Sequence, residues 1–483
     1  MYQQLEGGRG RDVYFRAPRI KAGLLVKGEV PMVWLGELQG RIRDLSSGGL
    51  LCDLLRHEHL PVPGAVIPIQ IQVRDEPLFS SNAEVVRAES VRGVARIAVR
   101  FLGALLDPNQ VRARAQDAVF RGAFDAGLSV YSTVPAEYRL AINDAVLILS
   151  HWRDLIDGRE REIRNGRLDS ELPELVELQE VAERRVRIDW QRVHARASEA
   201  ANEARSSPQG IDAAKRLTET LLTPLLIDAP IWRQAYLKPR GYPGDFELMN
   251  LMYEETQRGD SVFARVKHQL GREEKLAATV RHRKDFLVGQ LETELRRHNR
   301  KSEDLRVTNI GAGPARELEE FLLKVELDSR LVVTLIDQDE AALEYAHERL
   351  RRASLHHGDR VDLRCRFVSF KHLLAETALT EEVQEQDLIY TAGFFDYLPD
   401  SVAEPLLARL VGLLRDGGRL LVGNAVDATE VKWVPEFVLD WEMIYRTPAD
   451  MRRLARSIAC SCQLDVAFDE SGAWQFLSAQ RRC

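Results

Sequence analysis

Two glycines and a downstream aspartate have the arrangement of a nucleoside-binding site. Gly311 and Gly313 separate an apolar stretch from a helical pattern, so the backbone can turn tightly and a ligand can approach it closely. The next apolar stretch ends at Asp337, where a carboxylate can accept hydrogen bonds from both hydroxyls of a ribose. This pattern predicts a nucleoside site, although Asp337 as a simple helix cap remains an alternative.

Three features favour S-adenosylmethionine (SAM) over NAD as the nucleoside. Pro314 directly follows Gly313, where the pyrophosphate of NAD would press against the start of the helix. Strand and helix patterns continue after the turn and complete one compact domain. Residues 462–470 and 474–482 flank a Ser-Gly-Ala turn and are expected to form a terminal hairpin. An NAD-dependent oxidoreductase remains an alternative.

Methyl transfer from SAM makes modest demands on the protein. The sulfonium already activates the methyl group, so the protein aligns the acceptor and excludes water. A carboxylate acceptor is ionised at neutral pH and needs no base. A hydroxyl or amine acceptor needs one, for which Asp245 and Asp396 are the candidates.

Other residues have types suited to an anionic, acyl-like acceptor. Arg446, Lys238 and Arg240 can hold an anion, and aromatic side chains can line an apolar pocket. These aromatic residues are Tyr242, Phe394, Tyr397, Trp441 and Tyr445. Three plainer interpretations stay open. Arg446 can pair with Asp440 or Glu442 as scaffold, Trp441 and Tyr445 can pack on one helical face, and residues 238–245 can be a turn instead of a lid.

The elements around these residues indicate several domains. From about residue 300, buried strands alternate with helices, which predicts a doubly wound α/β sheet of Rossmann-like type. Residues 20–105 contain short β-branched stretches with Gly and Pro turns, which predicts a small antiparallel β-barrel. Residues 109–230 have helical spacing with many Glu and Arg, and are expected to transmit a signal or to form a homodimer.

Composition excludes several classes of protein. The 483 residues carry a net charge of −7, which argues against a nucleic-acid-coating protein. Five scattered cysteines and no ligand-spaced histidines argue against disulfides and a metal site. Because no apolar run is long enough for a membrane span and no secretory signal is visible, we expect a cytoplasmic protein.

Residues 300–483 resemble the class I SAM-dependent methyltransferases. The first motif of that family is similar to Asn309–Ala315, although Asp or Glu is more usual at position 309; strand ends at Asp337, Phe367–Phe370 and Asp387–Tyr397 match too. The resemblance implies a seven-stranded sheet with an antiparallel last strand. It implies a cofactor site made of Asn309, Gly311, Ala312, Gly313, Asp337, Gln338, Ser369, Phe370, Thr391, Ala392 and Gly393.

A narrower resemblance extends over residues 230–483. Lys238–Asp245, Ala392–Leu398, Gly423-Asn424 and Asp440–Arg446 look like motifs of bacterial extracellular-factor (3-hydroxypalmitic acid methyl ester) biosynthesis proteins. It implies fatty-acid methyl ester formation. The candidate catalytic residues are then Tyr242, Asp245, Asp396, Tyr397 and Arg446.

Residues 12–108 resemble the PilZ domain, a receptor for cyclic di-GMP. Its turn motif matches at Asp44, Ser46 and Gly49, but its two-arginine motif keeps only Arg19, for which Arg16 or Arg11 can supply the missing partner. The resemblance implies a dinucleotide site made of Arg16, Arg19, Asp44, Ser46 and Gly49. A degenerate barrel that contacts proteins remains the alternative.

The predicted architecture is therefore multidomain. We expect a PilZ-like β-barrel over 1–110, a helical connector over 111–230, a helical lid and extension over 231–299, and a methyltransferase domain over 300–483. The expected activity is methylation of a small or lipid-like carboxylate, regulated by cyclic di-GMP. A non-enzymatic receptor that binds SAM or cyclic di-GMP is the competing class.

Overall fold

The computed structural model forms two compact units. It describes residues 3–7, 11–15, 20–21, 31–55, 60–73, 76–91, 94–103, 105–107, 109–114, 133–165, 172–298, 303–368, 383–428 and 431–482. The N-terminal unit comprises Met1–Pro243, Arg258–His268 and Lys432–Trp441. The C-terminal unit comprises Gly244–Gln257, Gln269–Val431 and Glu442–Cys483. The units are thus interleaved in sequence.

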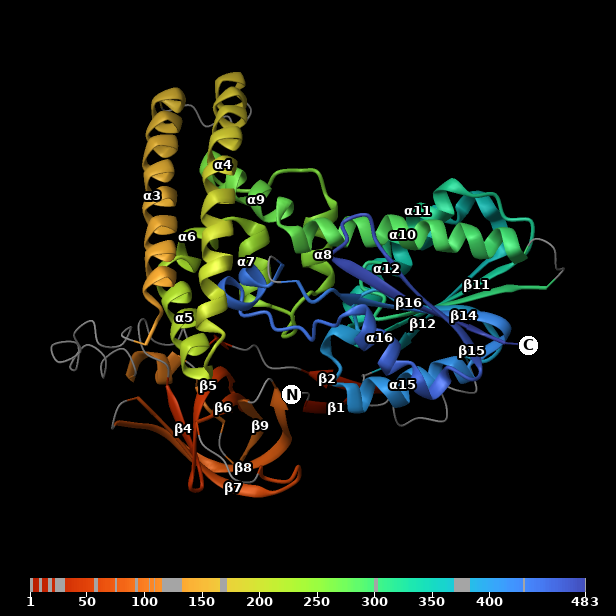
Figure 1. The fold of residues 1–483 in the computed structure, drawn as a ribbon, viewed down its shortest axis with the longest axis horizontal. Helices are drawn as coiled ribbons and strands as arrows, with labels where there is room; N and C mark the ends of the chain where they lie inside the picture. Colours follow the sequence, from red (N-terminus) through yellow and green to blue (C-terminus); the bar gives the residue numbers. More distant parts are fainter. Residues whose placement is uncertain are drawn as a thin grey trace. The chain divides into compact units, whose positions relative to one another are not determined.

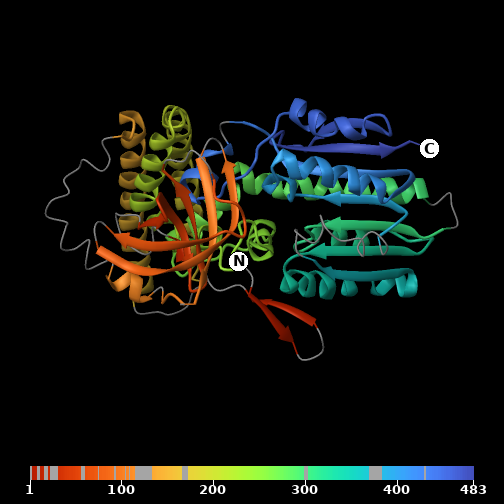
Figure 2. The same ribbon diagram turned by 90° about the horizontal axis from the view of Figure 1, so that it is seen from below.

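The N-terminal unit contains an antiparallel barrel (Figure 2). After a hairpin of β1 (Gln3–Gly7) and β2 (Arg11–Phe15), its strands are β3 (Ile20–Lys21), β4 (Met32–Leu35), β5 (Leu38–Ser46), β6 (Gly49–Leu54), β7 (Val66–Val73), β8 (Glu76–Val91) and β9 (Val94–Leu102). Pairing of β5 with β6 closes six of these strands, and β3 lies beside β5. Alternate residues such as Val33, Ile42 and Val99 fill the interior, which confirms the predicted barrel.

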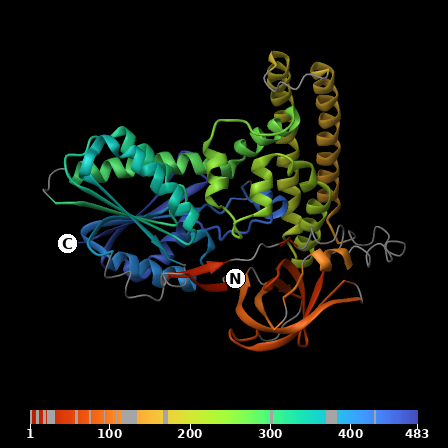
Figure 3. The same cartoon turned by 180° about the vertical axis from the view of Figure 1, so that it is seen from behind.

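Helices complete the N-terminal unit. They are α3 (Ala136–Arg164), α4 (Pro173–Ala204), α5 (Pro208–Leu221), α6 (Thr223–Leu226), α7 (Pro230–Leu237) and the first part of α9 (Val262–Glu273). The long α3 and α4 lie side by side (Figure 3). Segment Lys432–Trp441, with a short π-helix at Val434–Val438, packs among these helices. Trp433 Nε1 donates to Tyr138 Oη at 3.1 Å, and Thr223 Oγ1 donates to the Val438 carbonyl at 3.0 Å.

The outer face of α3 carries exposed leucines. Leu140, Leu147 and Leu155 lie exposed at seven- and eight-residue spacing. This pattern is compatible with the expected homodimer, which stays a prediction. Among the described helices, none is long and apolar enough to cross a membrane.

The C-terminal unit is built on a seven-stranded sheet. Its strands are β10 (Leu305–Ile310), β11 (Leu331–Asp337), β12 (Val361–Phe367), β13 (Gln386–Thr391), β14 (Leu414–Ala425), β15 (Cys462–Phe468) and β16 (Trp474–Arg481). They lie in the order β12-β11-β10-β13-β14-β16-β15, parallel except for β16, which is antiparallel to β14 and β15. The predicted doubly wound sheet and terminal hairpin are confirmed.

Helices cover both faces of this sheet (Figure 1). One face carries α10 (Lys275–His298), α11 (Arg316–Lys324) and α12 (Glu340–Ala353), and the other carries α15 (Asp400–Gly412) and α16 (Pro448–Leu454). Helix α8 (Phe246–Tyr253) contacts α10. Short helices occur at Leu355–Arg360, Phe395–Tyr397 and Arg456–Ile458. Because β10 and β13 are adjacent parallel strands whose crossovers lie on opposite faces, their carboxyl ends open a ligand-binding edge.

Candidate functional site

The glycine turn lies at the carboxyl end of β10. Gly311 and Gly313 have φ values of 68° and 52°, a region that favours glycine. A Cβ at Gly313 would meet no atom within 4 Å, so this side of the turn is open to a ligand. The Gly313 amide donates to Asp337 Oδ2 at 2.8 Å, which ties the turn to the end of β11.

Asp337 is a buried carboxylate with two backbone donors. Besides Gly313, the Asp339 amide donates to its Oδ1 at 2.9 Å. Burial raises the pKa of Asp337 to about 6, although these two amides oppose the rise. At neutral pH the group is ionised and can accept further hydrogen bonds. The helix-cap alternative is weakened, because the cap of α12 is Asp339, which accepts from the Ala341 amide at 3.1 Å.

Asn309 and Thr391 flank the turn on β10 and β13. Asn309 Nδ2 donates to Glu317 Oε1 at 2.9 Å, and Tyr390 Oη donates to the same oxygen at 2.7 Å. Burial raises the pKa of Glu317. Within the described residues, Asn309 Oδ1 and Thr391 Oγ1 are buried without a hydrogen-bond partner.

Asp396 lies in the loop after β13 and is only 1 % exposed. Its Oδ1 accepts from the Ala425 amide at 2.8 Å, and its carbonyl accepts from the Ile444 amide at 2.7 Å. Its Oδ2 is buried and finds no partner in the described part of the chain. Burial raises the pKa of Asp396 to about 7, with the charges of Arg283 and Arg446 acting in the opposite direction. The carboxyl can therefore donate or accept a proton near neutral pH.

Arg446 holds this loop together from within the chain. Its guanidinium donates to the carbonyls of Phe395 (2.9 Å) and Leu398 (2.6 Å), to Asn424 Oδ1 (2.6 Å) and to Asp400 Oδ1 (2.7 Å). The residue is 2 % exposed. These contacts favour the scaffold interpretation of Arg446, with Asp400 as its carboxylate partner in place of Asp440 or Glu442.

The Lys238–Asp245 segment is a turn between α7 and α8. Lys238 ends α7 with φ 48°, and its Nζ donates to the carbonyls of Leu439 and Asp440 at 2.9 and 3.0 Å. Asp245 is buried and caps α8 by accepting from the Leu248 amide at 2.8 Å. The chain leaves the N-terminal unit after Pro243, so Tyr242 and Asp245 belong to different units. A lid role for this segment stays a prediction.

Most of the remaining predicted residues directly follow β10, β11 or β13. Tyr397 is partly exposed at the end of its short helix, and Ala392 and Gly393 continue from β13. Gln338 follows Asp337 directly, and Ala312 lies buried in the glycine turn. Ser369 and Phe370 lie outside the described residues, so their adenine-binding role stays a prediction.

The start of β16 adds residues that sequence reasoning missed. Register pairs Ala425 with Trp474 and Asn424 with Gln475, so β16 begins beside the carboxyl end of β14. Trp474 Nε1 and Gln475 Oε1 are buried without a hydrogen-bond partner among the described residues. A Cβ at Gly423 would lie 2.4 Å from the Ala392 carbonyl oxygen, which explains the glycine there. The signal was the Ser-Gly-Ala turn, which marks where β16 begins.

These unpaired atoms fit a bound SAM molecule. Buried polar atoms without partners are rare in proteins, and those of Thr391, Asp396 and Trp474 lie at the carboxyl ends of β13 and β14, where a bound polar ligand or water would satisfy them. Asp337 would bind the ribose hydroxyls. The backbone of the Gly311–Gly313 turn would contact the cofactor directly, because no side chain intervenes. The sulfonium of the bound cofactor supplies the activated methyl group. The loop containing Asp396 would then orient the acceptor.

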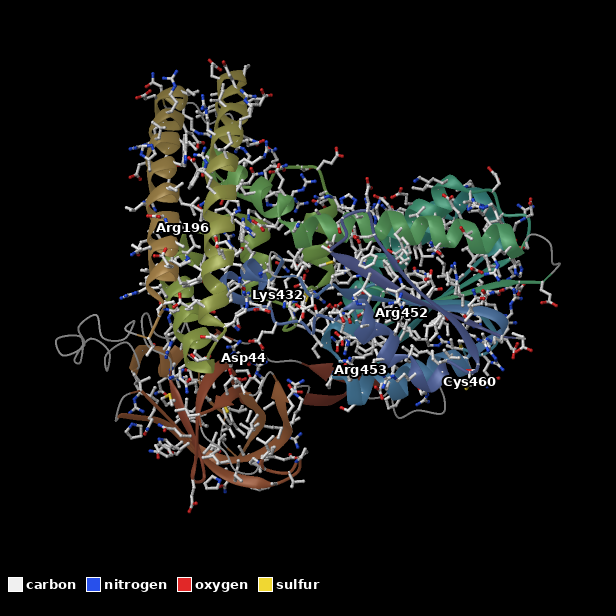
Figure 4. The ribbon with its side chains drawn as sticks, viewed as in Figure 1. Asp44, Arg196, Lys432, Arg452, Arg453 and Cys460 are labelled. Carbon is white, nitrogen blue, oxygen red and sulfur yellow. The ribbon has the colours of Figure 1, made fainter. Side chains whose placement is uncertain are left out.

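The barrel contains the other predicted site. Asp44 (Figure 4) and Ser46 lie near the end of β5, and Gly49 begins β6. Ser46 Oγ donates to the Gly49 carbonyl at 3.1 Å. The three residues of the turn motif are therefore brought together. Arg16 and Arg19 lie outside the described residues, so their part in a dinucleotide site stays a prediction.

Comparison with known families assigns both domains. Residues 16–120 match the model of the PilZ domain, and residues 308–420 match that of a methyltransferase domain. No curated protein matches the chain in sequence.

Similar solved structures include the following three. A possible exported protein from Bordetella parapertussis is 17 % identical over 53 % of this chain and 85 % of its own, with a TM-score of 0.41. Magnesium protoporphyrin IX methyltransferase from Synechocystis PCC 6803 with bound SAH is 13 % identical over 49 % and 93 %, with a TM-score of 0.35. N-methyltransferase NodS from Bradyrhizobium japonicum WM9 is 16 % identical over 37 % and 78 %, with a TM-score of 0.26.

Scores at this level carry no argument about substrate. The match to the methyltransferase model favours methyl transfer over the NAD-dependent alternative. The chain is a SAM-dependent methyltransferase that carries an N-terminal PilZ domain.

Proposed function

We propose that the enzyme methylates the carboxylate of a small or lipid-like acid and forms a methyl ester. The observation that carries this proposal is Asp396, whose buried Oδ2 has no partner in the described chain. Its raised pKa, about 7, keeps a protonated fraction that can donate a hydrogen bond to one oxygen of an acceptor carboxylate. The other oxygen attacks the methyl group, which needs no base because the acceptor is already ionised. The similarity of motifs to the extracellular-factor proteins points to the same acceptor class.

A second candidate rests on the same side chain. In its ionised form, Asp396 can remove a proton from a hydroxyl or amine acceptor. The two candidates differ in the product, because a methyl ester is hydrolysed by mild alkali whereas a methyl ether or methylamine is not.

The product test follows from this difference. The full-length enzyme would be incubated with methyl-labelled SAM and a panel of fatty acids, with and without a 3-hydroxyl group, together with the matching alcohols. We expect mass spectrometry to find label in an acid product that mild alkali releases as methanol. The Asp337→Ala variant is the control for enzyme-dependent transfer. Label only in alkali-stable products would contradict the carboxylate proposal and favour the second candidate.

We further propose that cyclic di-GMP regulates transfer through the barrel and segment Lys432–Trp441. Register shifts at Arg43, between the pairs Ile42–Cys52 and Asp44–Leu51, which makes Arg43 the bulged residue of β5. A bulge redirects its side chain. Arg43 ion-pairs with Asp440 and lies 3.5 Å from Asp53, immediately next to the motif residue Asp44.

Asp440 is well placed to pass on a change at the barrel. It has φ 45°, and the carbonyls of Leu439 and Asp440 are held by Lys238. Segment Lys432–Trp441 begins at Lys432 (Figure 4) and belongs to the N-terminal unit. From Asp440 the chain continues to Ile444, whose amide binds the Asp396 carbonyl, and to Arg446. A dinucleotide bound beside Arg43 would compete for its guanidinium and so alter the restraint on this segment.

Asp440→Asn tests this route. We expect cyclic di-GMP to change the methyl-transfer rate of the wild-type enzyme, and the variant to bind the dinucleotide within about threefold of wild type while losing most of that rate response. Binding would be measured by calorimetry and transfer by release of SAH. Arg41→Gln is the matched control, because Arg41 lies on the same strand and pairs with Asp212 on α5.

The outcomes separate the parts of the proposal. If cyclic di-GMP neither binds nor changes the rate in the wild-type chain, regulation through the barrel fails. If it binds and acts equally on wild type and Asp440→Asn, regulation stands but the Arg43–Asp440 route is wrong.

A further inference from the structure

Arg283 on α10 lies beside the backbone that follows β13, at the carboxyl edge of the sheet. It belongs to none of the sequence motifs described above. Its Nη1 lies 2.9 Å from the position of a Cβ at Gly393, so the guanidinium packs directly on the backbone after β13. Its Cζ lies 4.6 Å from the ring centroid of Trp474, and its Nη2 lies 3.4 Å from Met249 Sδ. The guanidinium is thus held in position by an aromatic ring, a thioether and a glycine, and by a hydrogen bond with the Tyr253 side chain.

This cation has no carboxylate partner among the described residues. No ion pair joins it to an acid there, and its Nε is buried without a hydrogen-bond partner. The neighbouring Lys284 contrasts with it, since its ammonium pairs with both Asp285 and Glu320. A partly buried guanidinium that forms no direct ion pair among the described residues can take an anion from outside the chain as its partner.

Arg283 acts electrostatically on acids near both the glycine turn and the Asp396 loop. Its charge opposes the rise in pKa of Glu317, on the helix that follows the turn, and of Asp396, in the loop after β13. Gly393 follows β13, and β13 is separated from β11, which ends at Asp337, by β10 alone. Two strand spacings are about 10 Å, so Arg283 beside Gly393 and Asp337 at the end of β11 are separated by about this distance along the sheet edge.

SAM carries its α-carboxylate at the end of the methionine portion, on the far side of the sulfonium from the ribose. If Asp337 binds the ribose, a methionine portion that extends along the sheet edge toward β13 brings its carboxylate to Arg283. We propose that Arg283 binds the α-carboxylate of the methionine portion of SAM. An acceptor carboxylate is the competing anion, and titration of SAH in the absence of any acceptor distinguishes the two. The inference rests on the cofactor and is independent of the acceptor and of cyclic di-GMP.

The test compares two ligands that differ only in this carboxylate. SAH and its decarboxylated analogue, 5′-deoxy-5′-(3-aminopropylthio)adenosine, would be titrated into the full-length enzyme by calorimetry. We expect wild type to bind SAH about 10- to 100-fold more tightly than the analogue, the range for a hydrogen-bonded charge pair. Arg283→Met should lose this preference while binding the analogue as wild type does, and Arg283→Lys should keep part of it.

Lys284→Met is the matched control, because it removes a cation from the same helix that already has carboxylate partners. It should keep the full preference for SAH. The proposal is overturned if wild type binds both ligands equally, a result that needs no variant to fold. It is also overturned if Arg283→Met binds SAH as wild type does, which would assign the cation to another anion.

Discussion

Asp337→Ala is expected to weaken SAH binding by at least about 100-fold. An ionised aspartate that accepts hydrogen bonds from two ribose hydroxyls contributes about 3–6 kcal/mol, and the variant loses both bonds. It also releases the amides of Gly313 and Asp339, which hold the turn. Calorimetry with SAH measures the effect. Asp362→Asn is the control, because Asp362 lies on the edge strand β12, where it pairs with Arg330.

A pH titration separates the contact of Asp337 with the ribose from its hydrogen bonds to the Gly313 and Asp339 amides. Because the pKa of Asp337 is raised to about 6, the ionised form is lost as the pH falls through 6, so wild-type affinity for SAH should decrease between pH 7 and pH 5. Asp337→Asn cannot titrate and should show weak, pH-independent binding. If Asp337→Ala binds SAH as wild type does, the assignment of the cofactor site is wrong.

Asp396→Ala is expected to lower the turnover number by about 10- to 100-fold, while Asp396→Asn keeps much of the activity. The reason is the hydrogen-bond donor: an asparagine amide can replace a protonated carboxyl that donates to an acceptor carboxylate, whereas alanine cannot. With a pKa of about 7, the protonated form is lost as the pH rises through 7, so wild-type kcat/KM should fall above pH 7. Asp396→Asn should lack this fall.

The alternative role of Asp396 gives the opposite results. A general base is active when ionised, so kcat/KM would rise toward pH 7 and Asp396→Asn would be as inactive as alanine. Thermal unfolding provides the control for both variants, because alanine leaves the Ala425 amide without its acceptor. A rising profile with an inactive asparagine variant would replace the carboxylate proposal by a hydroxyl or amine acceptor.

Residues that act through local backbone geometry could be predicted from sequence. Gly311, Gly313 and Asp337 lie where their order in a strand–turn–helix pattern puts them, since parallel strands end at one edge. Asp44, Ser46 and Gly49 likewise form one turn because they are close in the chain.

Residues whose partners are distant could not be predicted. Arg446 looked suited to an acceptor anion, but its guanidinium binds Asp400, Asn424 and backbone carbonyls that come together only when β14 packs beside the β13 loop. Asp440, considered as a partner of Arg446, pairs instead with Arg43 on the barrel. Side-chain types alone cannot choose between such partners, because the choice depends on burial and on which backbone groups are already satisfied.

The sequence by itself determined the fold class, the barrel and the strand–turn–acid pattern from which the cofactor site is predicted, because periodicity, glycine turns and strand ends are local properties. Only the tertiary structure decided which charges are occupied and which are free for a ligand. It committed Arg446 and Lys238 to the chain's own groups and left Arg283 without a carboxylate in the described residues. The physical reason is that a charge acquires its role from its neighbours after burial, and those neighbours come from distant parts of the chain.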